Sequence, residues 1–259
     1  MTKIFADTAD LSLIKELLAQ GVPIDGVTTN PSLLQKAMGE KKFSPQELDR
    51  IYINLLREIR KILPQGSISG EIFITPKTPK EEIYRLAEKM SDQVSRIHIK
   101  IPIFKAGLAA AADFVKRGGR VNMTLCFSLE QAAAVERIVG YLSKNDQVYV
   151  SPFIGRLNDI GLRGMSLIEN IQRQFTKDKA KTKLLAASIR SKDQFYDCLA
   201  LKVDIVTVPP QILFEWKGDN FKRPKNIKYV APHRHLNIKH PLTDKGFDLF
   251  IQSQQALLK

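Results

Sequence analysis

A lysine stands inside the apolar segment RIHIKIP at residues 96–102, where its amine could do covalent chemistry. Three isoleucines alternate with His98 and Lys100 in this segment, and successive side chains of a β-strand point to opposite faces. A buried amine is either paired with an acid or gives up its proton more easily, and an uncharged amine attacks a carbonyl carbon to form a Schiff base. Lys100 is therefore a candidate nucleophile for cleavage of a C–C bond next to a carbonyl, chemistry that needs no metal or organic cofactor.

The same alternation places polar side chains of other strand-like segments on the face that Lys100 shares. They are mostly near the C-terminal ends of these segments: Asp7, Glu71, Asn122, Thr124 and Ser151. The carboxylates, with a bound water, could carry the proton transfers of such a reaction. The structural alternative is that Lys100 only forms an inward ion pair with Asp7 or Glu71.

Eight strand-like segments alternate with segments of helical periodicity, which predicts a parallel sheet. The expected strands are 3–7, 26–29, 67–75, 96–102, 120–126, 147–152, 183–188 and 204–208. Eight such units in 259 residues favour a closed (β/α)₈ TIM barrel, an α/β fold, over an open doubly wound sheet. The first strand is followed by ADTADLS and not by a glycine-rich nucleotide loop, which also favours the barrel. In a barrel, the C-terminal ends of the strands carry the active site.

Helix starts are marked by capping-box patterns at Ser44–Glu47, Thr78–Glu81, Ser128–Gln131 and Ser191–Gln194. Pro45 and Pro79 are expected at the first helical position. We expect one domain over residues 1–259, in which 217–259 form a basic connection and an additional C-terminal helix with the sequence DKGFDLFIQSQQALL.

Composition and charge narrow the functional classes. With 44% apolar and 26% charged residues and no apolar run of about 20 residues, the chain is expected to be cytoplasmic and not membrane-bound. Cys126 and Cys198 stand apart in apolar segments, which indicates neither a disulfide framework nor a metal cluster. The net charge of +13 attracts polyanions without selecting among them, and a solvated basic surface is the favoured explanation of it.

The segment DNFKRPKNIKYVAPHRH at 219–235 interleaves basic and aromatic residues that could stack on bases. A catalytically silent barrel that binds nucleic acid or another polyanion is therefore an alternative to an enzyme. The nearby histidines at 233, 235 and 240 lack the regular spacing of a metal site, so no metal is expected.

Six segments, in order along the chain, together resemble the transaldolase family of class I Schiff-base enzymes. They are DGVTTNPSLL (25–34), IKIP (99–102), NMTLCFS (122–128), SPFIGR (151–156), LAASIR (185–190) and HPLTDKG (240–246). The resemblance extends from Ile4 to about Phe250. The resemblance implies a (β/α)₈ barrel that acts on sugar phosphates without a cofactor, and a homo-oligomer; nucleic acid is not an expected partner.

The resemblance also implies a role for individual residues. Lys100 matches the Schiff-base lysine, Asp7 the carboxylate that handles the substrate hydroxyl proton, and Glu71 with Thr124 the pair that holds the catalytic water. The implied substrate-binding residues fall into two groups. The dihydroxyacetone end is lined by Thr28, Asn30, Asn122 and Ser151, and the phosphate is bound by Arg156, Ser188 and Arg190.

Two positions separate the transaldolases from the similar fructose-6-phosphate aldolases, which typically have glutamine at Glu71 and tyrosine at Phe127. Because Phe127 has no hydroxyl to protonate the bound fragment, the resemblance implies transfer of a dihydroxyacetone unit from sedoheptulose 7-phosphate to glyceraldehyde 3-phosphate. The products are erythrose 4-phosphate and fructose 6-phosphate, and the aldolase activity is the alternative. His98, commonly aliphatic in the family, is expected either to tune Lys100 or to be a hydrogen-bonded core histidine.

Overall fold

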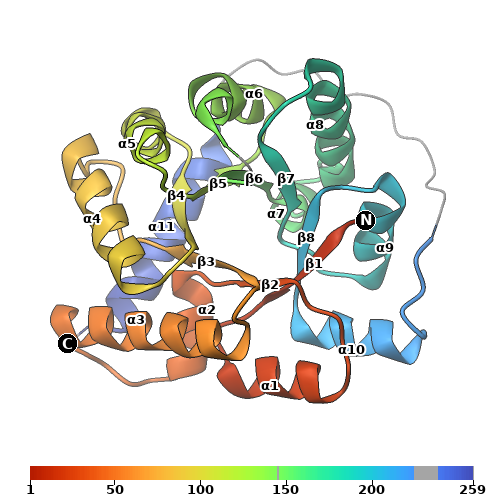
Figure 1. The fold of residues 1–259 in the computed structure, drawn as a ribbon, viewed down its shortest axis with the longest axis horizontal. Coiled ribbons are helices and arrows are strands. Elements are labelled where there is room, and N and C mark those ends of the chain that lie inside the picture. The colour runs from red at the N-terminus through yellow and green to blue at the C-terminus, as the bar shows by residue number, and fades with distance from the viewer. Residues whose placement is uncertain (145, 225–238, 259) are drawn as a thin grey trace.

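The structure is a computed structural model that describes residues 1–144, 146–224 and 239–258. Its centre is a closed barrel of parallel strands in the order β1 to β8, in which β8 pairs with β1 (Figure 1). The strands are β1 (Lys3–Asp7), β2 (Gly26–Thr28), β3 (Ser67–Glu71), β4 (Ile97–Pro102), β5 (Val121–Cys126), β6 (Val148–Pro152), β7 (Lys183–Ala186) and β8 (Ile205–Val208). The predicted (β/α)₈ barrel is confirmed.

Helices surround the barrel and connect successive strands (Figure 1). They are α1 (Leu11–Ala19), α2 (Pro31–Met38), α3 (Pro45–Ile62), α4 (Lys80–Gln93), α5 (Lys105–Lys116), α6 (Leu129–Ile138), the 3₁₀ turn η1 (Gly140–Leu142), α7 (Ile154–Asn158), α8 (Gly164–Asp178), α9 (Lys192–Leu201), α10 (Pro210–Gly218) and α11 (Pro241–Ala256). Within the described residues, no helix combines the length and the apolar character that crossing a membrane requires.

Three of the four helix starts predicted from capping-box patterns are found in the structure. Ser44 and Glu47 form a complete capping box at the start of α3, with Pro45 in the first turn. Ser128 and Ser191 cap α6 and α9 by accepting the backbone N–H three residues later. These side chains satisfy N–H groups that a helix start leaves without a partner.

The start of α4 differs from the prediction. Pro79 is the extended N-cap residue and not the first helical residue, and it supplies no side-chain cap. Thr78 turns back instead, and its Oγ1 accepts the backbone N–H of Thr75 at 2.9 Å. β3 ends at Glu71 and not at residue 75: past Ile72, which still donates to the carbonyl of Lys100 at 3.3 Å, the chain leaves the sheet.

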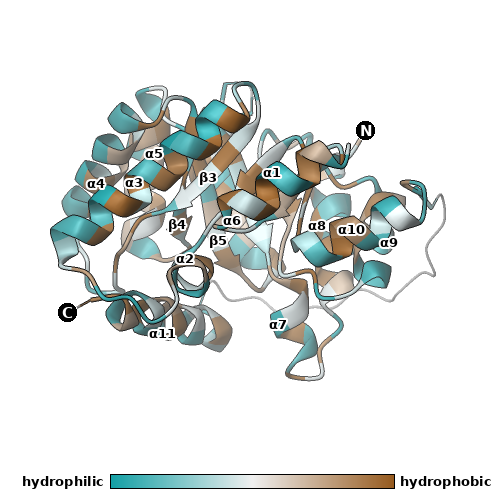
Figure 2. Cartoon of the chain, turned by 90° about the horizontal axis from the view of Figure 1, so that it is seen from below, coloured by the Kyte–Doolittle hydropathy of each residue, from teal (hydrophilic) through white to brown (hydrophobic). Residues whose placement is uncertain are grey.

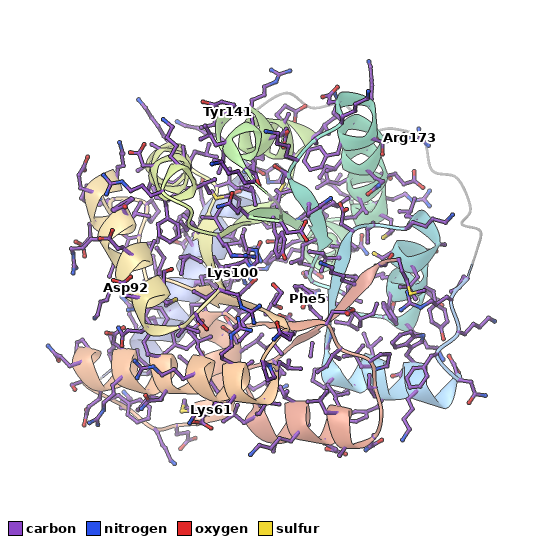
Figure 3. All side chains as sticks on the ribbon, in the orientation of Figure 1. Phe5, Lys61, Asp92, Lys100, Tyr141 and Arg173 are labelled. Carbon is purple, nitrogen blue, oxygen red and sulfur yellow. The ribbon has the colours of Figure 1, made fainter. Side chains whose placement is uncertain are left out.

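The alternating faces of the strands are divided between the helices and the barrel interior. A Cβ added to Gly70 of β3 would meet the side chain of Leu56 on α3 at 2.9 Å, so this face packs tightly against the helices. The residues on either side, Ser69 and Glu71, are buried on the interior face. Figure 3 shows Lys100 inside the ring of strands, whereas Lys61 lies on an outer helix.

Helix α11 is the additional C-terminal helix that the sequence predicts. In Figure 2, α2, α7 and α11 lie along one edge of the molecule, and α11 packs against α2 and the end of β5. A Cβ on Gly246 would come within 2.6 Å of the Leu125 side chain and 2.8 Å of Arg156 Nη1, so α11 can approach this closely only because residue 246 is glycine. The helix thus contributes to the end of the barrel where the strands terminate.

Candidate functional site

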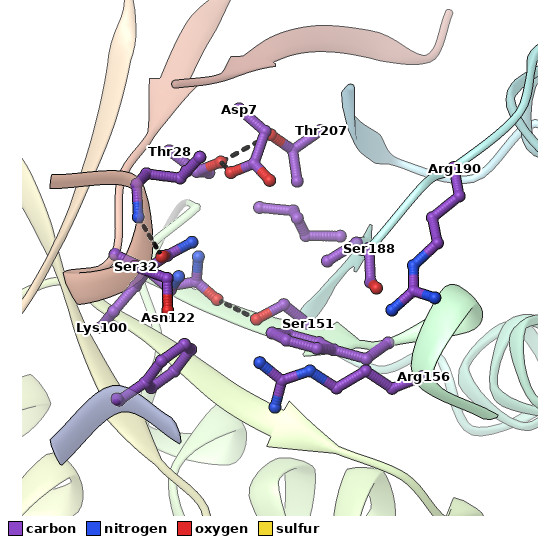
Figure 4. Close-up of a pocket in the computed structure, with 16 residues that line it drawn as sticks. Asp7, Thr28, Ser32, Lys100, Asn122, Ser151, Arg156, Ser188, Arg190 and Thr207 are labelled. Carbon is purple, nitrogen blue, oxygen red and sulfur yellow. Dashed lines mark hydrogen bonds between the residues drawn. The ribbon is translucent and has the colours of Figure 1, made fainter. Parts of the chain in front are cut away.

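A cavity of about 210 Å³ lies at the C-terminal ends of the strands (Figure 4). Its walls include most of the predicted site residues, from β1, β2, β4, β5 and β6, from helix α7 and from the loops that follow β2 and β7. These are Asp7, Thr28, Asn30, Lys100, Asn122, Ser151, Arg156, Ser188 and Arg190. The other three predicted residues, Glu71, Thr124 and Phe127, are buried outside this lining.

Lys100 is only 4% exposed and reaches the cavity from β4. Its Nζ lies 3.1 Å from Glu71 Oε2 and donates a hydrogen bond of 3.1 Å to the backbone oxygen of Thr29. The amine is therefore held at the cavity edge by one carboxylate and one carbonyl. Lys100 therefore both pairs with Glu71 and reaches the cavity, whereas the sequence had left an ion pair and a reactive amine as alternatives.

The two carboxyl groups near Lys100 have perturbed acidities. Burial raises the pKa of Glu71, and the charge of Lys100 lowers it in part. Burial also raises the pKa of Asp7, against the smaller opposing effects of Lys100 and of a hydrogen bond from Thr28. Each carboxyl therefore holds a proton at a higher pH than an exposed one, which suits a group that exchanges protons during a reaction.

Two buried oxygen atoms in the interior have no hydrogen-bond partner among the described residues: Glu71 Oε2 and Thr124 Oγ1. Lys100 Nζ, 3.1 Å away, is the charged partner of Glu71 Oε2 and compensates this oxygen in part. Buried polar atoms in folded proteins are almost always satisfied, and exceptions gather at functional sites. Glu71 and Thr124 therefore differ from the core polar residues around them.

Asn122 is held in one orientation by two serines, Ser151 on the neighbouring strand β6 and Ser69 on β3, across β4. Ser151 Oγ donates to Asn122 Oδ1 at 2.8 Å, a bond drawn in Figure 4, and Asn122 Nδ2 donates to Ser69 Oγ at 3.2 Å. Asn122 also pairs in register with Lys100 across β4 and β5. The amide and the Ser151 hydroxyl thus form an ordered polar wall beside the lysine.

Two arginines lie across the cavity from Lys100 (Figure 4). The Arg156 guanidinium is 5.1 Å from the ring centroid of Phe153 and 5.3 Å from that of Phe250 on α11, and its Nη1 is buried without a hydrogen-bond partner in the described structure. Arg190 forms an ion pair with Asp159. Guanidinium groups bind phosphate through a planar fork of donors, so this end of the cavity suits an anionic ligand group.

A close approach of two loops brings these arginines together. Gly155 donates its backbone N–H to the Ser188 carbonyl at 2.9 Å, and Ser188 has a left-handed backbone with φ of 58°. A Cβ at position 155 would lie 2.5 Å from Arg190 Nε and 2.6 Å from the Ser188 oxygen. The glycine in SPFIGR is therefore required for contact with LAASIR.

Phe127, expected at the substrate, does not line this cavity. Its ring packs behind Phe153 with centroids 5.7 Å apart, and His240 stacks on it at 5.5 Å. The reason is an irregularity at the end of β5, where Leu125 has a φ of 58° and the register with β6 shifts. The aromatic residues in the cavity wall are Phe153 and Phe250.

His98 faces the interior at the N-terminal end of the barrel. Its Nε2 lies 2.8 Å from the Asp146 carbonyl, its Nδ1 is 3.2 Å from Ser67 Oγ, and its ring stacks on Tyr149 at 3.9 Å. Because a carbonyl only accepts, Nε2 carries the proton and Nδ1 accepts from Ser67. Burial lowers the pKa of His98 to about 3, so it is neutral at pH 7. These contacts are those of a hydrogen-bonded core histidine.

Seven further residues line the cavity: Ser32, Leu33, Phe153, Leu185, Ala187, Thr207 and Phe250. Thr207 could have been found by the alternation in the strand segment DIVTV, and Phe153 by its place in SPFIGR. Phe250 has no local signal, because only the packing of α11 brings it to the cavity.

Part of the basic connection lies outside the described residues, at 225–238, including the histidines at 233 and 235. Most of the segment considered for nucleic-acid binding is in this range. In the rest of the chain, no three His, Cys, Asp or Glu side chains are placed to hold a metal ion.

Comparisons with known proteins agree with this geometry. A family model described as transaldolase/fructose-6-phosphate aldolase matches residues 4–259. A probable transaldolase of Chelativorans sp. is 35% identical over 96% of this chain and 94% of its own length. A probable transaldolase of Ruegeria pomeroyi is also 35% identical, over 98% of this chain and 97% of its own.

Solved structures resemble the fold alone. A putative dehydratase from Mesorhizobium loti has a TM-score of 0.54 at 11% identity and covers 82% of this chain. An enolase of the mandelate racemase subgroup from Agrobacterium tumefaciens has a TM-score of 0.51 at 11% identity and covers 80%. This chain spans about half the length of each, 55% and 54%.

Proposed function

The chain belongs to the transaldolase/fructose-6-phosphate aldolase family, and from this premise we propose that it is a transaldolase that works through a Schiff base on Lys100. It transfers a dihydroxyacetone unit from sedoheptulose 7-phosphate to glyceraldehyde 3-phosphate, giving erythrose 4-phosphate and fructose 6-phosphate. The observation that carries the proposal is a buried lysine amine at the edge of a cavity whose opposite wall has two arginines.

In the proposed reaction, the Lys100 amine attacks the C2 carbonyl of the ketose, and water leaves as the iminium forms. Asp7 then takes the proton of the C4 hydroxyl, the C3–C4 bond breaks, and its electron pair passes to the iminium as an enamine. The aldose leaves, the acceptor aldehyde takes its place, and the steps reverse. Support comes from the position of Asp7 on the same cavity and from burial, which raises its pKa toward that of a group able to return the proton.

We assign Glu71 and Thr124 to the water that enters and leaves during formation and hydrolysis of the Schiff base. Both offer a buried oxygen without a hydrogen-bond partner in the described structure, and Glu71 lies 3.1 Å from the Lys100 amine. A water in contact with both oxygens would satisfy them and lie next to the carbon that reacts.

We assign Arg156, Arg190 and Ser188 to the phosphate of the sugar. The Arg156 Nη1 atom has no hydrogen-bond partner among the described residues and can donate to a phosphate oxygen without breaking a bond. Thr28, Asn30, Asn122 and Ser151 remain for the hydroxyl groups of the dihydroxyacetone end, close to Lys100.

Transfer is favoured over simple aldol cleavage by the cavity wall. Phe153 and Phe250, the aromatic residues that line the cavity, have no hydroxyl with which to protonate the enamine, and Glu71 is a carboxylate. The bound fragment therefore waits for an acceptor aldose. The fructose-6-phosphate aldolase activity remains the competing hypothesis, and the polyanion-binding barrel is the third.

One experiment tests all three hypotheses. The protein is incubated with fructose 6-phosphate, reduced with borohydride and analysed by mass spectrometry, and a three-carbon adduct on Lys100 is expected. Erythrose 4-phosphate added with fructose 6-phosphate should yield sedoheptulose 7-phosphate. Fast release of free dihydroxyacetone without an acceptor would favour the aldolase. No adduct, together with tight and salt-sensitive binding of DNA or RNA, would overturn the enzyme hypothesis.

We further propose that the enzyme needs no cofactor and serves the pentose phosphate pathway in the cytoplasm. It is also proposed to assemble as a homo-oligomer and to form one domain over residues 1–259. Leu249 on α11 is 42% exposed, which offers an apolar contact for a second copy. Light scattering after size-exclusion chromatography measures the assembly, and a monomer at micromolar concentration would contradict it.

A further inference from the structure

We infer that Thr207 is a positioning residue whose hydroxyl, acting through Thr28, orients and polarises the Asp7 carboxylate. Thr207 is on β8, and the sequence-based assignment did not include it among the site residues. The inference rests on the proposed function, because it gives a structural partner to the group that handles the substrate proton.

Three side chains from three adjacent strands form a continuous hydrogen-bonded chain. Thr207 Oγ1 lies 2.6 Å from Thr28 Oγ1, and Thr28 Oγ1 lies 2.6 Å from Asp7 Oδ1 (Figure 4). Both threonines are 2% exposed, and all three residues line the cavity. Asp7 and Thr28 are register partners, whereas Thr207 pairs with Phe5, two residues before Asp7 on β1 and further from the cavity mouth.

The number of hydroxyl protons fixes which group donates in each of these two hydrogen bonds. An ionised carboxylate only accepts hydrogen bonds, so the single proton of the Thr28 hydroxyl is donated to Asp7. Thr28 must then accept from Thr207, which is the donor at the end of the chain. A hydroxyl that accepts one hydrogen bond donates a stronger one, so Thr207 strengthens the bond that Thr28 makes to Asp7.

These hydrogen bonds affect Asp7, which is the proton acceptor in the proposed reaction. With Oδ1 engaged by Thr28, the other carboxylate oxygen is the one that takes the substrate proton. The charged groups that share this cavity with Asp7 are Lys100, Arg156 and Arg190, and Glu71 lies behind Lys100. Burial raises the pKa of Asp7, and the hydrogen bond from Thr28 lowers it. A weaker hydrogen bond from Thr28 would therefore raise the pKa of Asp7 further.

The test compares Thr207→Val, which keeps the shape and removes the hydroxyl, with Thr207→Ser, which keeps the hydroxyl. For Thr207→Val we expect about a tenfold lower kcat of transfer and an acidic limb of the kcat profile displaced to higher pH. Borohydride trapping with fructose 6-phosphate should show more six-carbon and less three-carbon adduct, because cleavage is slowed after the Schiff base has formed. Thr207→Ser should keep the wild-type pH profile.

Other results would overturn the inference. One is an unchanged pH profile of kcat in Thr207→Val. The other is an equal loss of kcat in Thr207→Val and Thr207→Ser with no displacement of the acidic limb, which would indicate that Thr207 acts through packing alone. Thermal unfolding controls for the fold, and Thr207→Ala serves in the same comparison if the valine variant does not fold. Borohydride trapping of the wild-type protein distinguishes failure of the proposed function from failure of this inference. If the wild type forms no adduct on Lys100, both fail. If it forms the adduct but the Thr207 variants behave like the wild type, only the inference about Thr207 fails.

Discussion

His98 and Lys100 point into the same barrel from the same strand, two residues apart, and their surroundings are opposite in kind. His98 has a hydrogen-bond partner for each ring nitrogen and an aromatic ring stacked on it, at the N-terminal end. Lys100 faces a cavity, and the nearby Glu71 and Thr124 have oxygen atoms without a hydrogen-bond partner in the described structure.

Polarity inside the barrel therefore does not identify a functional residue. What distinguishes the two ends is whether the buried polar atoms have hydrogen-bond partners within the protein. A buried polar group with all its partners contributes to specificity and stability of the fold, as at His98. A buried polar group that lacks them is costly unless a ligand or a water completes it, as at the Lys100 end. Stability and chemistry are thus separated along a single strand.

The largest effect is expected from Lys100→Met, which removes the nucleophile. We expect at least about a 10³-fold loss of transfer activity and no borohydride adduct. The fold should persist, because Glu71, whose pKa burial already raises, can take a proton once its partner is gone. Activity assays and circular dichroism check both points, and a residual activity above a tenth of wild type would contradict the Schiff-base role.

A smaller loss is expected from Glu71→Gln, which keeps the shape of the side chain and removes its charge. Loss of a proton-handling carboxylate should lower kcat of transfer by about 10²-fold, while Lys100 still forms an adduct. Comparing single-turnover adduct formation with steady-state rate measures the difference. An unchanged steady-state rate would show that Glu71 only pairs with Lys100.

The other end of the strand should respond in stability and not in catalysis. His98→Phe keeps the stack on Tyr149 but leaves the Asp146 carbonyl without its partner and Ser67 with only a hydrogen bond of 3.4 Å to the Tyr149 hydroxyl. We therefore expect a loss of about 1–3 kcal/mol in unfolding free energy at pH 7. Transfer activity should be unchanged. Urea denaturation gives the stability, and a large fall in kcat with normal stability would mean that His98 does tune Lys100.

The same variant has a pH signature. The pKa of His98 is about 3 in the folded chain against 6.5 as the ordinary value, so between these limits only the unfolded state binds the proton. The wild-type unfolding free energy should therefore fall as pH drops below 6.5, by about 1.4 kcal/mol per pH unit from this residue. Asp7 and Glu71 are common to both proteins, so the difference between wild type and His98→Phe isolates the histidine. Parallel curves from pH 6.5 to pH 5 would contradict the assignment.

The smallest effect concerns the partition between transfer and release. Phe153→Tyr places a hydroxyl in the cavity wall and should raise release of free dihydroxyacetone by about threefold to tenfold relative to transfer. Phe127→Tyr, whose ring lies behind Phe153, is the matched comparison and should leave the ratio unchanged. An increase with Phe127→Tyr alone would restore the original assignment of that position.

Much of this site could be predicted from local pattern. Period-two alternation gave the inward direction of Lys100, Asp7 and Ser151, because a strand has only two faces. Capping chemistry gave the starts of α3, α6 and α9, since these bonds involve residues three apart. The same reasoning failed at Pro79, where Thr78 bonded back to Thr75. The position of the Phe127 ring behind Phe153 follows a backbone irregularity at Leu125, which the sequence pattern did not indicate.

By itself, then, the sequence determined the barrel, the strand that carries the lysine and the faces of its polar residues, all of which follow from regular local geometry. Only the tertiary structure decided which aromatic ring faces the cavity, how Phe250 and Gly246 of α11 enclose Arg156, and that Thr207 reaches Asp7 through Thr28. These depend on distances between residues up to 200 positions apart, set by barrel closure and helix docking, which no local pattern encodes.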